Sequence, residues 1–289
     1  TLWPLLAEMA FERKLSVGAP FFNMAFTPFM VALGVTLPLG SLLSWKRGRA
    51  GRAARQLVPA LVLAVAVAGL LWSMQSGRSL MGPIGAFLGT WLVAGAVTDL
   101  ASRLGKSRDL GRLLRLPRAD WGKAVAHSGL GITMLGVAVL MAYEQEDIRV
   151  AMPGVPFTVG DWEFELQGVE RVQGPNYWAD RGEVSVRRDG AEIAHLYPEK
   201  RSYPVTAMPT TEAAIDNGIM RDIYVVIGDA QQNGGWTTRV YIKPLANWIW
   251  GGALLMAIGG ALSLSDRRFR VAAGARKSEP AHSSGVAAE

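Results

Sequence analysis

Few side chains in this sequence could hold a metal or move a proton, and one of them lies in an unusual setting. There are three histidines and no cysteine, which excludes a thiolate zinc site, an iron–sulfur cluster and a cysteine nucleophile. His127 lies within the apolar stretch AVAHSGLG. Ionisable groups inside a membrane segment are costly and are usually functional. Imidazole commonly holds haem iron. The residue alone leaves two interpretations open: a haem ligand or proton relay, or an interhelical hydrogen bond to a backbone carbonyl.

The neighbours of His127 are small. Gly122, Ala126, Gly129 and Gly131 leave room for a bulky flat ligand or for close approach of a second helix. A haem held by two histidines would need a second membrane histidine, and this chain offers none. We therefore expect any second ligand to come from residues upstream or from another chain.

The remaining candidate sites are weaker. His195 lies in a predicted strand, where we expect a surface or half-buried imidazole with its hydrogen bonds satisfied, and His282 lies in a predicted tail. The segment YPEKRSYP (197–204) is either a solvated turn or a docking surface for a partner protein. Asp99 and Lys123 lie near the ends of apolar runs, where we expect their charges to reach the membrane surface.

Five apolar runs must position these residues. Each is close to the length of about 20 residues that a bilayer-spanning helix requires. Five such runs separated by charged loops argue against buried helices of a soluble core. The predicted spans cover residues 25–44, 57–73, 84–101, 121–143 and 245–264.

Charge predicts the orientation of the spans. Loops 45–56 and 102–120 and the segment after 264 are rich in Lys and Arg, so the positive-inside rule places them in the cytoplasm. Residues 1–24, loop 74–83 and segment 144–244 then lie outside. Tryptophans near predicted span ends fit the headgroup zone, whereas Trp91 is expected to pack within the bundle.

The net charge of +6 is unevenly distributed along the chain. Segment 144–244 holds 16 acidic and 10 basic residues, and the rest of the chain holds 8 acidic and 20 basic residues. The basic residues therefore flank membrane spans rather than forming a nucleic-acid-binding face.

Segment 144–244 has the pattern of a β-rich domain. Alternating runs such as WEFEL and EVSV are separated by glycines and prolines. Asp189–Gly190 between two such runs predicts a hairpin, and residues 210–215 suggest one short helical turn. The predicted fold is a membrane protein with a bundle of about five transmembrane helices and a small β-rich extracytoplasmic domain. Residues 265–289 are expected to form a disordered cytoplasmic tail.

Several long motifs resemble one family. TLWPLL (1–6), SVGAPFFN (16–23), the stretch from LYPEKRSYP to IDNG (196–218), RDIYVVIGD (221–229) and the last span with its flanks (241–268) resemble the C-terminal half of CcmF-type cytochrome c maturation proteins. The resemblance runs from Thr1 to about Arg268. Since the chain opens without a start methionine or a signal peptide pattern, we expect it to be the later part of a longer protein.

The resemblance implies a function. Such proteins are haem lyases of the bacterial inner membrane, which take haem from a periplasmic haem chaperone and join it to the CXXCH motif of an apocytochrome c. They work with subunits that reduce and chaperone the apocytochrome, and they carry a b-type haem between two membrane histidines. His127 matches the second of these, so the resemblance implies that it is a haem ligand. A quinol is the implied electron donor, although no residue here identifies its site.

Some family features are missing from this sequence. The tryptophan-rich WWD segment, two periplasmic haem-ligating histidines and the first membrane histidine would all lie upstream of Thr1. The resemblance therefore implies a chain that is incomplete as a lyase. Two other classes remain open at this point: a multi-span transporter, and a non-catalytic scaffold subunit in which replacing His127 would leave the haem spectrum unchanged.

Overall fold

The computed structural model describes residues 18–43, 50–74, 80–104, 115–204 and 209–266, together with residues 8, 9, 11 and 111. His282 and almost all of the predicted tail lie outside these residues, as does most of segment 1–24.

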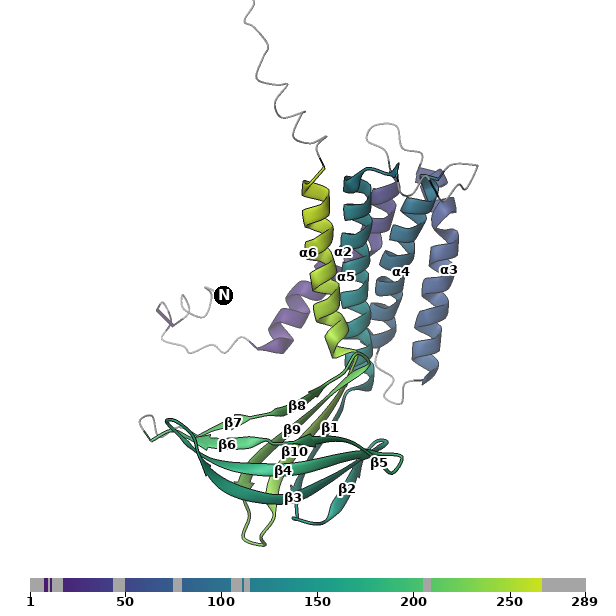
Figure 1. Cartoon of the computed structure of the whole chain (residues 1–289). Helices are drawn as coiled ribbons and strands as arrows, with labels where there is room; N and C mark the ends of the chain where they lie inside the picture. The colour runs from purple at the N-terminus through teal and green to yellow at the C-terminus, as the bar shows by residue number, and fades with distance from the viewer. Residues whose placement is uncertain are drawn as a thin grey trace, which may run out of the picture. The chain divides into compact units, whose positions relative to one another are not determined.

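Long apolar helices make up the membrane part of the described chain (Figure 1). Five helices are long and apolar enough to cross a membrane, as the sequence predicts, and no other described helix is. They are α2 (Ala19–Leu42), α3 (Ala50–Met74), α4 (Met81–Ser102), α5 (Arg118–Tyr143) and α6 (Ala246–Leu264). A helix that is apolar on all sides is stable where lipid or other helices surround it.

The chain divides into two compact units. The first comprises Thr1–Ala64, Leu88–Gly131 and Ala253–Glu289. Small residues bring its helices together: a Cβ placed on Gly122 of α5 would lie 2.5 Å from the carbonyl oxygen of Gly259 of α6. Close packing of backbones at small residues is the usual way that membrane helices associate. Trp91 of α4 is buried and donates from its indole to the carbonyl oxygen of Val35 in α2, at 3.2 Å, which confirms that it packs within the bundle.

The second unit comprises Val65–Phe87 and Ile132–Gly252. Its helical segments are joined by hydrogen bonds from side chains to backbone carbonyls. The Thr133 hydroxyl donates to the carbonyl oxygen of Ile249 at 3.3 Å, and the Tyr143 hydroxyl donates to that of Leu71 at 3.3 Å. Such bonds satisfy polar side chains where water is scarce.

A sandwich of two antiparallel sheets fills the rest of the second unit (Figure 1). One sheet has the order β1 (Gln145–Ala151), β10 (Trp236–Pro244), β9 (Arg221–Ala230) and β8 (Ala214–Asn217). The other has the order β2 (Pro156–Val159), β3 (Trp162–Gln173), β4 (Trp178–Arg188), β6 (Glu199–Ser202) and β7 (Pro209–Glu212), with β5 (Ala191–Leu196) also paired to β4. The predicted β-rich domain is therefore confirmed as a β-sandwich-like domain.

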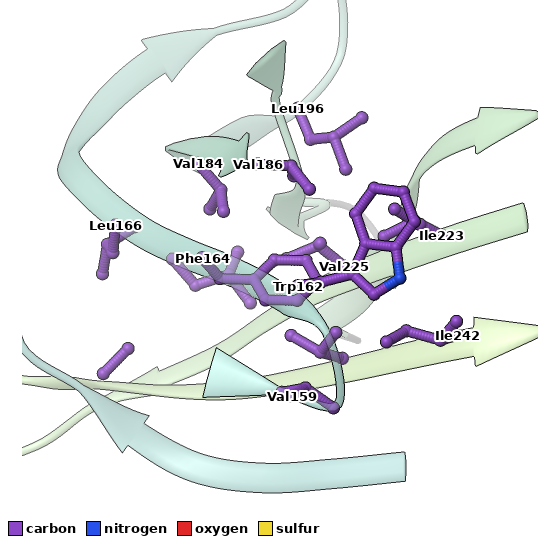
Figure 2. Close-up of a cluster of buried hydrophobic side chains, with 13 residues drawn as sticks. Val159, Trp162, Phe164, Leu166, Val184, Val186, Leu196, Ile223, Val225 and Ile242 are labelled. Carbon is purple, nitrogen blue, oxygen red and sulfur yellow. The ribbon is translucent and has the colours of Figure 1, made fainter. Parts of the chain in front are cut away.

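Alternate residues of both sheets form the core of the sandwich. Phe164 and Leu166 of β3 are buried with Ile223 and Val225 of β9, and Figure 2 shows these side chains converging between the two sheets. The period of two that predicted these strands is the period with which side chains alternate between the faces of a sheet. Burial of this core is the main force that holds the domain together.

Of two local predictions in this domain, the hairpin is confirmed and the helical turn is wrong. Asp189 and Gly190 both have positive φ, at 51° and 77°, and join β4 to β5 as the predicted hairpin. The helical turn predicted over residues 210–215 is wrong. All of them except Ala213 lie in β7 and β8, which pair with β6 and β9 respectively. Cross-strand hydrogen bonds with distant partners therefore override a weak local helical pattern.

Candidate functional site

His127 lies on α5 and its side chain is half-buried. No described residue forms a hydrogen bond or an ion pair with its imidazole, so the interhelical hydrogen bond that would give it a purely structural role has no partner among them. A polar ring within an apolar helix is costly unless it is paired. Among the described residues, none competes with a ligand for the ring nitrogens of His127.

Helix geometry defines the face on which His127 lies. Residues four positions apart share a face of a helix, so His127 lies between Lys123 and Gly131. A Cβ placed on Gly131 would lie 2.6 Å from the carbonyl oxygen of Gly89, and Lys123 pairs with Asp99. Both contacts are with α4. His127 therefore lies on the side of α5 that is turned toward α4.

The small residues around His127 bring helices together. A Cβ on Gly259 would lie 2.4 Å from the backbone nitrogen of Ala126 and 2.6 Å from the carbonyl oxygen of Gly122. Gly131 packs against α4 in the same manner. Of the two uses that the sequence suggested, close approach of a second helix is therefore the one observed at Gly122, Ala126 and Gly131.

A network of charged groups begins one helical turn from His127. The Lys123 ammonium lies 2.7 Å from a carboxylate oxygen of Asp99, whose side chain is only 4% exposed. Arg103 links this carboxylate to that of Asp120, at 3.4 and 2.8 Å. Lys123 also donates to the carbonyl oxygen of Ser41 at 3.4 Å. The expectation that the charge of Asp99 reaches the membrane surface is wrong, because this carboxylate is buried and paired with Lys123, whose own side chain is 28% exposed.

Sequence reasoning missed this ion pair, although a signal for it existed. Two opposite charges lay near corresponding ends of two successive spans. Successive spans with a connecting loop run antiparallel, and their charged ends then meet at one membrane surface. Burying an unpaired charge costs several kcal/mol, so pairing is the expected outcome.

The imidazole of His127 is the kind of side chain that could hold haem iron. An imidazole nitrogen is a usual axial ligand of haem iron, and this one has no competing partner among the described residues. The described residues contain no cluster of three or more His, Asp or Glu side chains that could hold a metal ion directly. His127 could therefore supply one ligand, and no other described histidine lies in an apolar helix.

The other histidine that the structure describes has the ordinary role expected for it. His195 lies on β5 and is exposed, with Nε2 2.9 Å from a carboxylate oxygen of Glu192 and Nδ1 3.6 Å from one of Glu183. It is a surface imidazole with one ring nitrogen hydrogen-bonded, as expected for a residue without a special role.

The YPEKRSYP segment is not a solvated turn. Its central residues form β6, which lies between β4 and β7. Glu199 is buried and accepts hydrogen bonds from Arg181 and Arg201, both at 2.7 Å. Arg201 also lies over the ring of Tyr177, at 4.5 Å. The docking role suggested by the sequence stays a prediction.

The two arginines stabilise the ionised form of Glu199. Burial opposes ionisation of Glu199, but the hydrogen bonds from Arg201 and Arg181 outweigh it, so the pKa of Glu199 lies below its ordinary value. The same pairing raises the pKa of Arg201. The charged triad therefore persists at neutral pH, and it joins β4 to β6 in the middle of a sheet.

Sequence similarity to known proteins extends along the whole chain. The family "CcmF C-terminal beta-sandwich" matches residues 142–244. The chain is 56% identical over 289 residues to "Cytochrome c-type biogenesis protein ccl1" of Rhodobacter capsulatus, a match that covers 100% of this chain and 44% of that protein. It is 40% identical over 273 residues to "Cytochrome c-type biogenesis protein CcmF" of Pseudomonas aeruginosa, covering 94% of this chain and 41% of that protein. The chain thus spans less than half the length of these relatives.

A solved structure has the same fold. "Cytochrome c Heme Lyase CcmF" superimposes with a TM-score of 0.69 at 24% identity, covering 92% of this chain and 42% of that one. At this identity the likeness concerns the fold alone. The five apolar helices and the bacterial relatives indicate a multi-pass protein of the bacterial inner membrane. The chain belongs to the CcmF-type family of cytochrome c-type biogenesis proteins and matches their C-terminal portion.

Proposed function

We propose that the chain is the C-terminal part of a cytochrome c haem lyase. In this proposal the complete lyase receives haem from a periplasmic haem chaperone and promotes thioether attachment to the CXXCH motif of an apocytochrome c. The observation that carries the proposal is the 56% identity, along the entire chain, to a cytochrome c-type biogenesis protein.

The proposed contribution of α5 is one ligand to a b-type haem. When bound, the haem supplies reversible one-electron chemistry, with a quinol as the proposed electron donor. His127 would supply one ligand to the iron, and a histidine elsewhere in the complete lyase would supply another. The half-buried imidazole without a partner among the described residues supports this role. Its place in an apolar helix also supports it, since such a site excludes water from the metal.

The proposed orientation places the sandwich in the periplasm. Loops 45–56 and 102–120 are basic, so they would lie in the cytoplasm and the segment between α5 and α6 would lie on the opposite side. The N-terminal segment would be periplasmic and the C-terminal tail cytoplasmic. The sandwich would then be available to the apocytochrome and to the subunits that reduce and chaperone it.

A transporter has less support. It would need charged groups facing a continuous path, but the charged side chains Asp99, Lys123, Arg103 and Asp120 pair with one another. A non-catalytic scaffold makes a different prediction about haem, which the following experiment tests.

The test is the optical spectrum of the complete lyase purified from membranes, with His127→Ala compared with the wild type. We expect loss of the reduced b-type α band and of most bound haem. His195→Ala is the matched control, because this exposed imidazole is remote from the apolar helices in sequence and should leave the spectrum unchanged. Full haem content with an unaltered spectrum in His127→Ala would refute ligation by His127 and favour the scaffold.

A further inference from the structure

The turn between β8 and β9 presents two large apolar side chains to its surroundings. Ile219 and Met220 are 77% and 66% exposed, which makes them the most exposed large apolar residues described in segment 144–244. Turns of this length usually carry Gly, Asn, Asp or Ser, which interact well with water. Adjacent exposed apolar residues are a sign of a binding surface.

The backbone of this turn is fixed to the start of α6. The carbonyl oxygens of Gly218, Ile219 and Met220 each accept a hydrogen bond, from the Asn247 side chain at 2.9 Å, the Trp248 indole at 3.1 Å and the Leu245 backbone N–H at 3.0 Å, respectively. The turn therefore lies at the level of the first turn of α6.

A buried polar contact strengthens this junction. Asp222 is 3% exposed, and its Oδ1 accepts hydrogen bonds from Asn247 Nδ2 at 2.9 Å and from the Gly218 N–H at 3.1 Å. Leu245, between β10 and α6, has a positive φ of 54°. A leucine keeps such a backbone conformation only where its surroundings hold it firmly. The position of the turn against α6 is thus fixed by several independent contacts.

The start of α6 has the character of a membrane interface. The helix is a candidate span, and Trp248 and Trp250 lie in its first turns, with Trp250 75% exposed. Indoles concentrate at the headgroup level, where one edge of the ring meets lipid and the other meets water. Ile219 and Met220 lie at the same level as the first turn of α6, because the Trp248 indole donates a hydrogen bond to the Ile219 carbonyl oxygen.

We propose that Ile219 and Met220 insert into the interfacial layer of the lipid bilayer beside the first turn of α6, and that the β8–β9 hairpin is a membrane anchor of the sandwich. Lipid is the occupant that the contacts favour, since the turn is hydrogen-bonded to the first residues of a helix long and apolar enough to cross the bilayer. The three carbonyls of the turn already have protein donors, and backbone groups need such partners where water is scarce. The anchor would hold the sandwich at a fixed depth, and it does not depend on the role of His127.

The absence of cysteine in this chain makes the test direct. Met220→Cys carries a nitroxide spin label in the full chain, reconstituted into phosphatidylcholine–phosphatidylglycerol nanodiscs. Frequent collisions of the spin label with oxygen indicate that the label lies in lipid. Frequent collisions with a polar nickel chelate indicate that it lies in water. Ile193→Cys on β5 is the matched control, because it is an exposed apolar residue of the same domain, at 45% exposure. Ile219→Cys repeats the measurement should Met220→Cys fold poorly.

We expect the label at 220 to favour oxygen over nickel several-fold more than the label at 193. Nickel accessibility at 219 and 220 equal to that at 193 would overturn the proposal, since the turn would then be in water. Low accessibility to both reagents would also overturn it, because a protein partner rather than lipid would then cover the turn.

Discussion

Two adjacent glycines on α6 should respond oppositely to the same substitution. Gly259 faces α5: an added Cβ would lie 2.4 Å from the Ala126 nitrogen and 2.6 Å from the Gly122 carbonyl oxygen. Gly260 has no atom within 4 Å of an added Cβ. Both obstructing atoms at Gly259 belong to backbone, which cannot move without displacing α5. Gly259→Ala must therefore separate the helices, whereas Gly260→Ala leaves their packing intact.

The magnitude follows from the comparison of the two variants. Both carry the same change in helix propensity, so this contribution cancels in the difference between them. What remains is the overpacking at Gly259, which costs about 1–3 kcal/mol for an extra carbon in a filled site. Ordinary carbon contacts lie at about 3.5–4.0 Å, so the helices would have to move apart by roughly an ångström.

The assay is reversible unfolding in mixed detergent micelles, followed by tryptophan fluorescence. We expect Gly259→Ala to be less stable than Gly260→Ala by about 1–3 kcal/mol, and Gly260→Ala to match the wild type or exceed it. Equal stability of the two variants would refute the close contact between α5 and α6.

Three further predictions concern charge and turn geometry. Asp99→Asn should lower stability by about 3–5 kcal/mol because it strands the Lys123 charge, whereas the double variant Asp99→Leu with Lys123→Met should lose far less in the same unfolding assay. The pKa of Glu199 is lowered on folding, so its stabilising contribution is complete above a pH of about 4.3 and is lost as the pH falls through the folded pKa. Acid should therefore lower the melting temperature of the wild type more than that of Glu199→Gln, as followed by circular dichroism. Gly190→Ala should cost about 1–2 kcal/mol because its φ is 77°, whereas Gly168→Ala, which meets open space in β3, should stay within about 0.5 kcal/mol.

The sequence was most informative where structure depends on local chemistry. Apolar length alone predicts the five helices, because a bilayer requires spans of about 20 residues. Alternation predicts β3 and β9, and the left-handed backbone of Asp189–Gly190 suits the tight turn that their residue types favour.

Features that depend on distant partners were not predictable. All of residues 210–215 except Ala213 form strands because β6 and β9 lie beside them, which no local pattern encodes. Glu199 is buried in a triad with Arg181 and Arg201 that joins two strands. Likewise, Asn247 meets Asp222 only because α6 starts where the β8–β9 turn lies.

The candidate site could be found in part from the sequence. An imidazole in an apolar run makes His127 a candidate functional residue on physical grounds, and the structure adds that no described residue forms a hydrogen bond with it. The small residues beside it could have served a ligand or a helix. Which of these they serve depends on α4 and α6, and the position of those helices is a property of the whole bundle.

Chemical rescue tests the central claim most directly. In the complete lyase, His127→Gly removes the proposed ligand, and free imidazole added to the purified protein can take the vacated place. We predict that the b-type α band of the reduced protein is lost in His127→Gly and returns as imidazole is titrated in, while His195→Gly is unaffected throughout. A His127→Gly protein that keeps its full α band without imidazole would contradict the account.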